Sequence, residues 1–197
     1  MTPLINTQIV KAALTLYLEY GGKQTDLDAF GLATQQIGTN SAYFPSKPFL
    51  LFMNYVVLRL TPKDVYHFLA KLVNKVSIPD TLEYLDPPPA TVEEGINQMI
   101  AVSRKIMPHS SIRLEKGIGN ASIKREKQIH NVKDETAAEL YTLVFVLNLI
   151  GTLSGKKEFV PNSIGLISLS RLVWSKYLAD GRIAKSATNP AQPLSAF

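Results

Sequence analysis

Basic side chains are concentrated in one sixth of the chain, residues 101–133, which includes the polar stretch GIGNASIKREKQIHNVK. This segment holds eight lysines and arginines but only two acidic residues, Glu115 and Glu126, so its net charge is +6. The rest of the chain has a net charge of −1, and the whole chain has +5. A cluster of basic side chains is the electrostatic footprint of a protein that binds a polyanion.

The basic residues of this segment are expected to contact phosphates rather than bases. Lys124 and Lys127 are expected on one face of a short polar helix, with Glu126 as the only acidic neighbour on that face. No Phe, Tyr or Trp occurs between Tyr84 and Tyr141, so this segment offers no ring for base stacking. This composition favours binding to the backbone of a nucleic acid without sequence readout. The candidate nucleic-acid-binding residues are Arg104, Lys105, Arg113, Lys116, Lys124, Arg125 and Lys127.

A second interpretation of the same residues stays open. A chain with only 19% charged residues needs a solvated face, and the basic segment would provide one. Arg104 and Lys105 also end a predicted helix, where cations complement the negative end of the helix dipole.

The sequence lacks the residue patterns of a metal site and of a nucleotide-binding loop. The chain has no cysteine, and none of His67, His109 and His130 has a second ligand at metal-binding spacing, so no metal site is expected. GIGNASIK has one residue between its glycines, whereas a phosphate-binding P-loop has four. Gly117 and Gly119 are instead expected to supply positive φ in a loop. We predict no cofactor.

Catalytic arrangements are also missing from the sequence. There is no Gly-x-Ser-x-Gly elbow for a nucleophilic serine. The carboxylate pairs Glu93–Glu94 and Asp134–Glu135 both stand at predicted helix starts, where capping and the helix dipole account for them. We therefore predict that the protein is not an enzyme.

The elements that position these residues are predicted to be helices, so the fold class is all-α with about seven to eight helices. Gly21–Gly22 should end the first helix, Thr61–Pro62 should begin the fourth, and Thr91 with Glu94 forms a capping box for the fifth. Residues 108–121 are expected to form a loop or a short hairpin. The predicted helices span about 4–20, 25–37, 48–60, 62–76, 91–107, 122–131, 135–153 and 163–179.

Two apolar patterns predict the core. The fourth helix has a single stripe of apolar residues at helical spacing from Val65 to Val76. The runs LYTLVFVLNLI and ISLSRLVWSKYL are expected to pack together, which would bury Phe145, Leu149, Leu169 and Trp174.

One helical domain, residues 1–181, is the predicted organisation, with the proline linker at 86–90 as a candidate boundary inside it. Residues 182–197 are rich in Ala, Ser and Pro, and we expect them to form an extended C-terminal arm. Leu194 and Phe197 are the expected anchors of this arm on a neighbouring copy.

These features together predict a structural subunit that self-assembles and binds single-stranded nucleic acid, most simply RNA, as a viral coat or nucleocapsid protein does. Its expected location is a virion or the cytoplasm. The two most apolar runs, 49–60 and 140–153, are shorter than the ~20 residues that cross a bilayer, so no membrane partner is expected. The alternative is a helical, non-catalytic subunit of a larger protein complex or of an RNA-guided effector.

Overall fold

The described part of the protein forms two compact units, Met1–Ser77 with His130–Val144 and Ile78–Ile129 with Phe145–Phe197. For residues 62, 104–106 and 194–196 only the backbone is described. The computed structural model describes residues 4–32, 37, 41–106, 112–125, 136–156, 159, 161 and 194–196.

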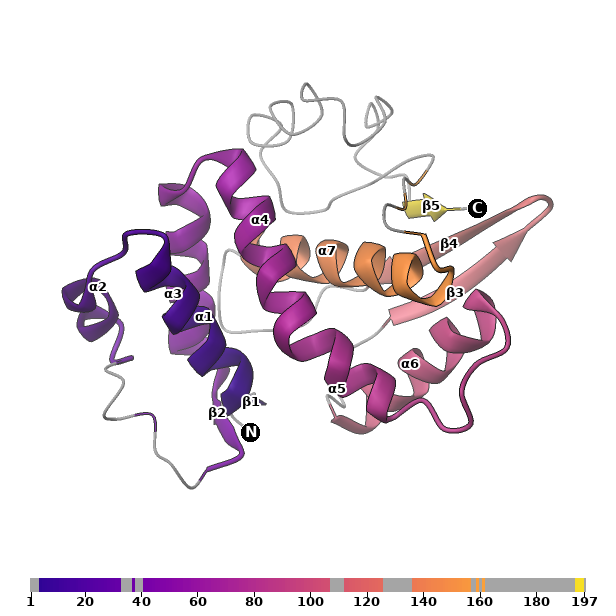
Figure 1. The fold of residues 1–197 in the computed structure, drawn as a ribbon, viewed down its shortest axis with the longest axis horizontal. Coiled ribbons are helices and arrows are strands. Elements are labelled where there is room, and N and C mark those ends of the chain that lie inside the picture. The colour runs from indigo at the N-terminus through magenta and orange to yellow at the C-terminus, as the bar shows by residue number, and fades with distance from the viewer. Residues whose placement is uncertain are drawn as a thin grey trace. The chain divides into compact units, whose positions relative to one another are not determined.

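The described residues are mostly helical, as the sequence predicts, but the fold is not purely all-α. A two-stranded sheet joins β1 and β2, and a three-stranded sheet has the order β3-β4-β5 (Figure 1). The predicted eighth helix, 163–179, lies outside the described residues.

In the first unit, a short antiparallel sheet pairs β1 (Leu4–Asn6) with β2 (Tyr43–Pro45). The first helix, α1 (Thr7–Glu19), therefore begins three residues later than predicted. The reason is the side chain of Asn6, whose Oδ1 accepts a hydrogen bond from the Gln8 N–H at 2.7 Å and caps the helix.

Glycines in the left-handed region end the first two helices. Gly21 follows α1 with φ 79°, as the sequence predicts. The second helix, α2 (Gln24–Ala29), ends well before the predicted residue 37, because Gly31 takes φ 66°. The N–H of Leu32 then donates to the Leu27 carbonyl at 2.9 Å, which completes a Schellman motif and stops the helix.

The third and fourth helices, α3 (Ser46–Arg59) and α4 (Pro62–Leu72), are joined by Thr61. Its hydroxyl accepts from the Asp64 N–H at 3.3 Å, so the predicted cap is confirmed. The predicted apolar stripe of this helix is also buried, from Val65 to Val76.

The chain stays helical beyond residue 76, where the predicted fourth helix ends. A π-helical turn, η1 (Val73–Ser77), leads directly into α5 (Ile78–Glu83). Pro79 has no N–H to donate to the Lys75 carbonyl, and the wider π turn before it allows the helical path to continue.

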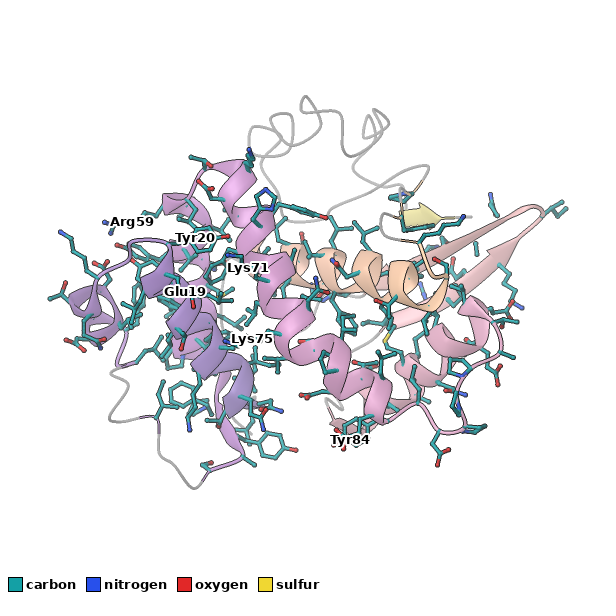
Figure 2. The ribbon with its side chains drawn as sticks, viewed as in Figure 1. Glu19, Tyr20, Arg59, Lys71, Lys75 and Tyr84 are labelled. Atoms are coloured by element: carbon teal, nitrogen blue, oxygen red, sulfur yellow. The ribbon has the colours of Figure 1, made fainter. Side chains whose placement is uncertain are left out.

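A polar cluster ties α1, α2 and α3 together in the first unit. The Tyr17 hydroxyl donates to Asp26 Oδ2 at 2.6 Å, and Arg59 forms an ion pair with the same oxygen at 3.3 Å. The Tyr55 hydroxyl is hydrogen-bonded to Arg59, which is labelled in Figure 2. The Tyr17 bond holds the pKa of Asp26 below its usual value, while burial and that same bond raise the pKa of Tyr17.

A second cross-helix contact involves a cation and an aromatic ring. The Lys71 ammonium on α4 lies 5.2 Å from the ring centroid of Tyr20, the residue that follows α1 (Figure 2). The same ring packs edge-on against Phe68, with 5.8 Å between the ring centroids. Tyr20 therefore joins the end of α1 to α4 by both apolar and cation–π contact.

The second unit contains α5, α6 (Val92–Ile106), the three-stranded sheet and the last part of α7 (Thr136–Leu153). The predicted cap is confirmed, since Thr91 Oγ1 accepts from the Glu94 N–H at 3.1 Å. The predicted capping box forms only in part, because Glu94 accepts from the Ala90 N–H at 2.8 Å, one residue before the N-cap. Gly95 allows α6 to approach α7, because a Cβ there would lie 2.6 Å from Leu153 Cδ1.

The most apolar helix, α7, has the predicted bounds to within one residue. Leu149 is fully buried as predicted, whereas Phe145 is only half-buried; Leu169 and Trp174 lie outside the described residues. By length and composition α7 is also able to cross a membrane, but 56% of it is buried within the protein, and core helices of soluble proteins pass the same test.

The first prediction concerns Asp26. Its folded-state pKa is lowered, so its carboxylate stabilises the fold at pH values above the unfolded-state pKa, and this contribution is lost as the pH falls through the folded-state pKa. Asp26→Asn should lower Tm at pH 7, and the difference from wild type should shrink below pH 3.8. Thermal melts followed by circular dichroism from pH 7 to pH 3 would measure this. The exposed Asp28→Asn on the same helix is the control, and a pH-independent difference for Asp26→Asn would contradict the prediction.

The second prediction concerns the core. Leu149→Ala removes a fully buried side chain and should cost ~2–5 kcal/mol of unfolding free energy. Leu147→Ala on the same helix removes a half-buried side chain and should cost clearly less. Urea denaturation of both variants makes the comparison, and equal costs would show that α7 buries a different face.

Candidate nucleic-acid interface

The centre of the basic segment is a β-hairpin. Strands β3 (Ile112–Gly117) and β4 (Asn120–Arg125) pair antiparallel around a two-residue loop, Ile118–Gly119 (Figure 1). The predicted polar helix is therefore wrong over residues 122–125, and residues 126–131 lie outside the described part. Gly119 has φ 74°, so the predicted positive φ is confirmed there, whereas Gly117 ends β3 and has no positive φ.

The two faces of the hairpin differ in character because side chains alternate along a strand. Ile112 on β3 and Ile123 on β4 are buried, at 6% and 4% exposure. Their face also carries Leu114, Lys116 and Arg125, and β3 packs against α6. The alternate positions form the opposite, outward face, which holds Arg113, Glu115 and Lys124.

A carboxylate lies between the two cations of this outward face. Arg113 and Lys124 are direct register partners, and like charges in such positions repel. Arg113 Nε is 3.0 Å from Glu115 Oε1, and the Lys124 ammonium pairs with the other carboxylate oxygen. The Lys124 hydrogen bond is the main cause of a lowered pKa for Glu115. Glu115 therefore stays ionised and holds both cations on the face.

A third basic residue connects the hairpin to α6. Lys116 forms an ion pair with Glu93 in the first turn of α6, and both side chains are more than half exposed. Sequence analysis explains Glu93 by capping and the helix dipole, and the structure adds Lys116 as an ion-pair partner. The pair links the edge of the hairpin to the start of the helix.

The structure brings four of the seven predicted residues onto this one hairpin. Arg113 and Lys116 are on β3, and Lys124 and Arg125 are on β4. The prediction that Lys124 shares a helical face with Lys127 fails, because Lys124 is on a strand and has Glu115 as its acid partner. The hairpin has four basic residues and one acidic residue, so its net charge is +3.

The other predicted residues have only their backbone described or lie outside the described residues. Arg104 and Lys105 are in the last turn of α6, as the sequence predicts, with only their backbone described. Lys127 and Phe197 lie outside the described residues.

The sequence did not reveal the role of Glu115. The signal that could have revealed it is the spacing of Arg113 and Glu115. In an Arg-x-Glu segment that forms a strand, both side chains lie on one face. This pattern is informative only once residues 112–117 are assigned as a strand.

The C-terminal strand pairs with the same hairpin. Strand β5 (Leu194–Ala196) lies antiparallel to β4, with Ile123 opposite Leu194, Ser122 opposite Ser195 and Ala121 opposite Ala196. Leu194, the predicted assembly anchor, thus lies next to β4 of its own chain.

Comparison with known proteins identifies no family for this chain. No protein-family description matches the chain, and no curated protein is significantly similar to it. Within the described ranges, no group of three or more histidine or carboxylate side chains is arranged to hold a metal ion.

The third prediction concerns the hairpin turn. A residue with a Cβ at φ 74° is strained, so Gly119→Val should cost at least ~1–2 kcal/mol of unfolding free energy. Gly119→Asn is the matched variant, because asparagine tolerates the left-handed region, and it should cost less. Urea denaturation compares the two, and equal effects would mean that the turn is not constrained at this residue.

Proposed function

We propose that the protein is a structural subunit that self-assembles and binds the backbone of single-stranded nucleic acid, RNA by preference, without sequence readout, as a viral coat or nucleocapsid protein does. The observation that carries the proposal is the +3 hairpin, whose outward face presents Arg113 and Lys124 side by side. A phosphodiester chain is a natural ligand for adjacent cations at this spacing. The proposal includes no catalytic activity and no cofactor, and it places the protein in a virion or the cytoplasm.

The ion pairs of the hairpin are compatible with this role. Arg113 and Glu115 have exposed side chains, and Lys124 is one-third exposed. Solvent screens such pairs strongly, so they contribute little to stability. A phosphate can therefore replace the Glu115 carboxylate as the partner of both cations. In the absence of a phosphate, the Glu115 carboxylate offsets the repulsion between the two cations.

The second candidate is a non-catalytic helical subunit of a larger protein complex or RNA-guided effector. Leu51 and Leu58 favour it, since they are seven residues apart on α3 and are 42% and 77% exposed. Exposed apolar side chains on one helix face are typical of a protein-binding surface. Nucleic acid that co-purifies with the protein, read from the 260/280 nm absorbance ratio, would favour the first candidate.

The fourth prediction tests the outward face with poly(U) binding at several salt concentrations. Arg113→Gln/Lys124→Gln should weaken binding and reduce the salt slope by up to ~1.4, which corresponds to ~0.7 per contact with a single strand. Glu115→Gln should strengthen binding, because the competing carboxylate is lost while both cations remain. Fluorescence anisotropy of a labelled oligonucleotide measures both changes.

The control has the same change in net charge in the other unit of the chain. Lys11→Gln/Lys63→Gln removes two exposed lysines, one on α1 and one on α4, and should leave the salt slope nearly unchanged. If the two double variants behave alike, net charge alone governs binding and the hairpin is not the site. An unchanged affinity in Glu115→Gln would likewise argue against phosphate contact by this face.

A further inference from the structure

Strand β4 is paired along both of its edges. One edge pairs with β3 and the other with β5, from the C-terminal end of the chain. Without β5, this second edge would present unpaired backbone N–H and C=O groups, which are a template for another strand. Three consecutive residues, 121–123, define the register of the strand that fits there.

We propose that this edge is the acceptor through which copies of the protein assemble, with residues 194–196 of one copy pairing with β4 of another in the register seen within one chain. This inference rests on the self-assembly in the proposed function and adds the surface that performs it. The occupant is a second copy of this chain, and the mode is the exchange of an identical strand.

Exchange of β5 between two copies requires no contacts other than those that β5 makes within one chain. The strand makes the same backbone hydrogen bonds with the β4 edge of its own chain or with that of a neighbour. Twelve residues, 182–193, precede β5 beyond the predicted helical domain, and they can span up to roughly 40 Å when extended. That length exceeds the ~16–17 Å radius of gyration expected for a domain of this size, so a neighbouring copy is within reach.

The balance between the two pairings depends on concentration. Because β5 belongs to the same chain as its acceptor, its effective concentration there is on the order of millimolar. Dilute protein should therefore keep β5 on its own β4. When the local concentration of neighbouring copies also reaches the millimolar range, pairing of β5 with another chain becomes as favourable as pairing within its own chain.

Nucleic acid is the natural means of crowding, because β4 also carries Lys124 on the outward face, directly after its β5-pairing residues. A polyanion bound along the outward faces would bring several β4 edges close together. Strand exchange should then follow nucleic-acid binding, and assembly should increase with added poly(U).

The chain has no cysteine, which permits a direct test by disulfide cross-linking. Ser122 and Ser195 are register partners, and directly opposite antiparallel residues have Cα atoms ~4.5–5.5 Å apart, within the range that a disulfide spans. Full-length Ser122→Cys and Ser195→Cys chains, each with a different mass tag, are mixed with poly(U), oxidised, and separated without reductant. The expected product is a covalent dimer that contains one chain of each kind, in greater yield with poly(U) than without it.

Two further mixtures act as controls. Thr152→Cys, at an exposed position on α7, replaces Ser122→Cys and reports random collision, so it should give little dimer. A Ser122→Cys chain that ends at residue 193 has no β5 of its own to occupy its acceptor edge. It should therefore cross-link to Ser195→Cys more readily than the full-length acceptor does.

The outcomes separate this inference from the proposed function. If light scattering shows assembly with poly(U), but the mixed chains give no more dimer than the Thr152→Cys control, strand exchange is wrong and the proposed function stands. A chain that carries both Ser122→Cys and Ser195→Cys can also be oxidised. If this double variant cross-links within one chain while the mixed single variants do not cross-link, strand exchange is likewise wrong. If the protein neither binds poly(U) nor assembles, both proposals are wrong.

Discussion

The pairing register of β3 and β4 is the constraint on which the candidate site depends. Burial of Ile112 and Ile123 fixes it, since a slip by one residue would move a strand's apolar side chains into solvent and turn its outward side chains, such as Arg113 or Lys124, toward the buried face. The same register places Lys124 opposite Arg113, with Glu115 two residues away on the same face. The charge arrangement on the outward face is thus a consequence of apolar burial on the inward face.

Much of the helical architecture was predictable because its signals are local. The caps at Thr61 and Thr91, the stop at Gly21 and the apolar stripe from Val65 to Val76 depend on residues within a few positions of each other. The early stop of α2 was missed, although Gly31 is its direct cause. A glycine can continue a helix or end it, and the sequence alone does not distinguish the two.

The hairpin was harder to predict, because what decides it is not local. Residues 122–125 have no apolar periodicity of their own that separates a strand from a short helix. The choice depends on β3, which supplies the hydrogen-bonding partner, and on α6, against which β3 packs. The basic cluster itself was visible in the sequence. Its division between two faces of a sheet, and the acid partners of Lys116 and Lys124, required the register.

Strand geometry explains how β4 can serve two proposed partners at once. The backbone hydrogen bonds of a strand lie in the plane of the sheet, whereas its side chains stand roughly perpendicular to that plane. Strand β5 pairs through the backbone at the β4 edge, and phosphates would contact side chains such as Lys124 on the outward face. The two contacts therefore do not compete for the same atoms. Binding at the face can raise the local concentration of acceptor edges without covering them, which is the physical basis for coupling nucleic-acid binding to assembly.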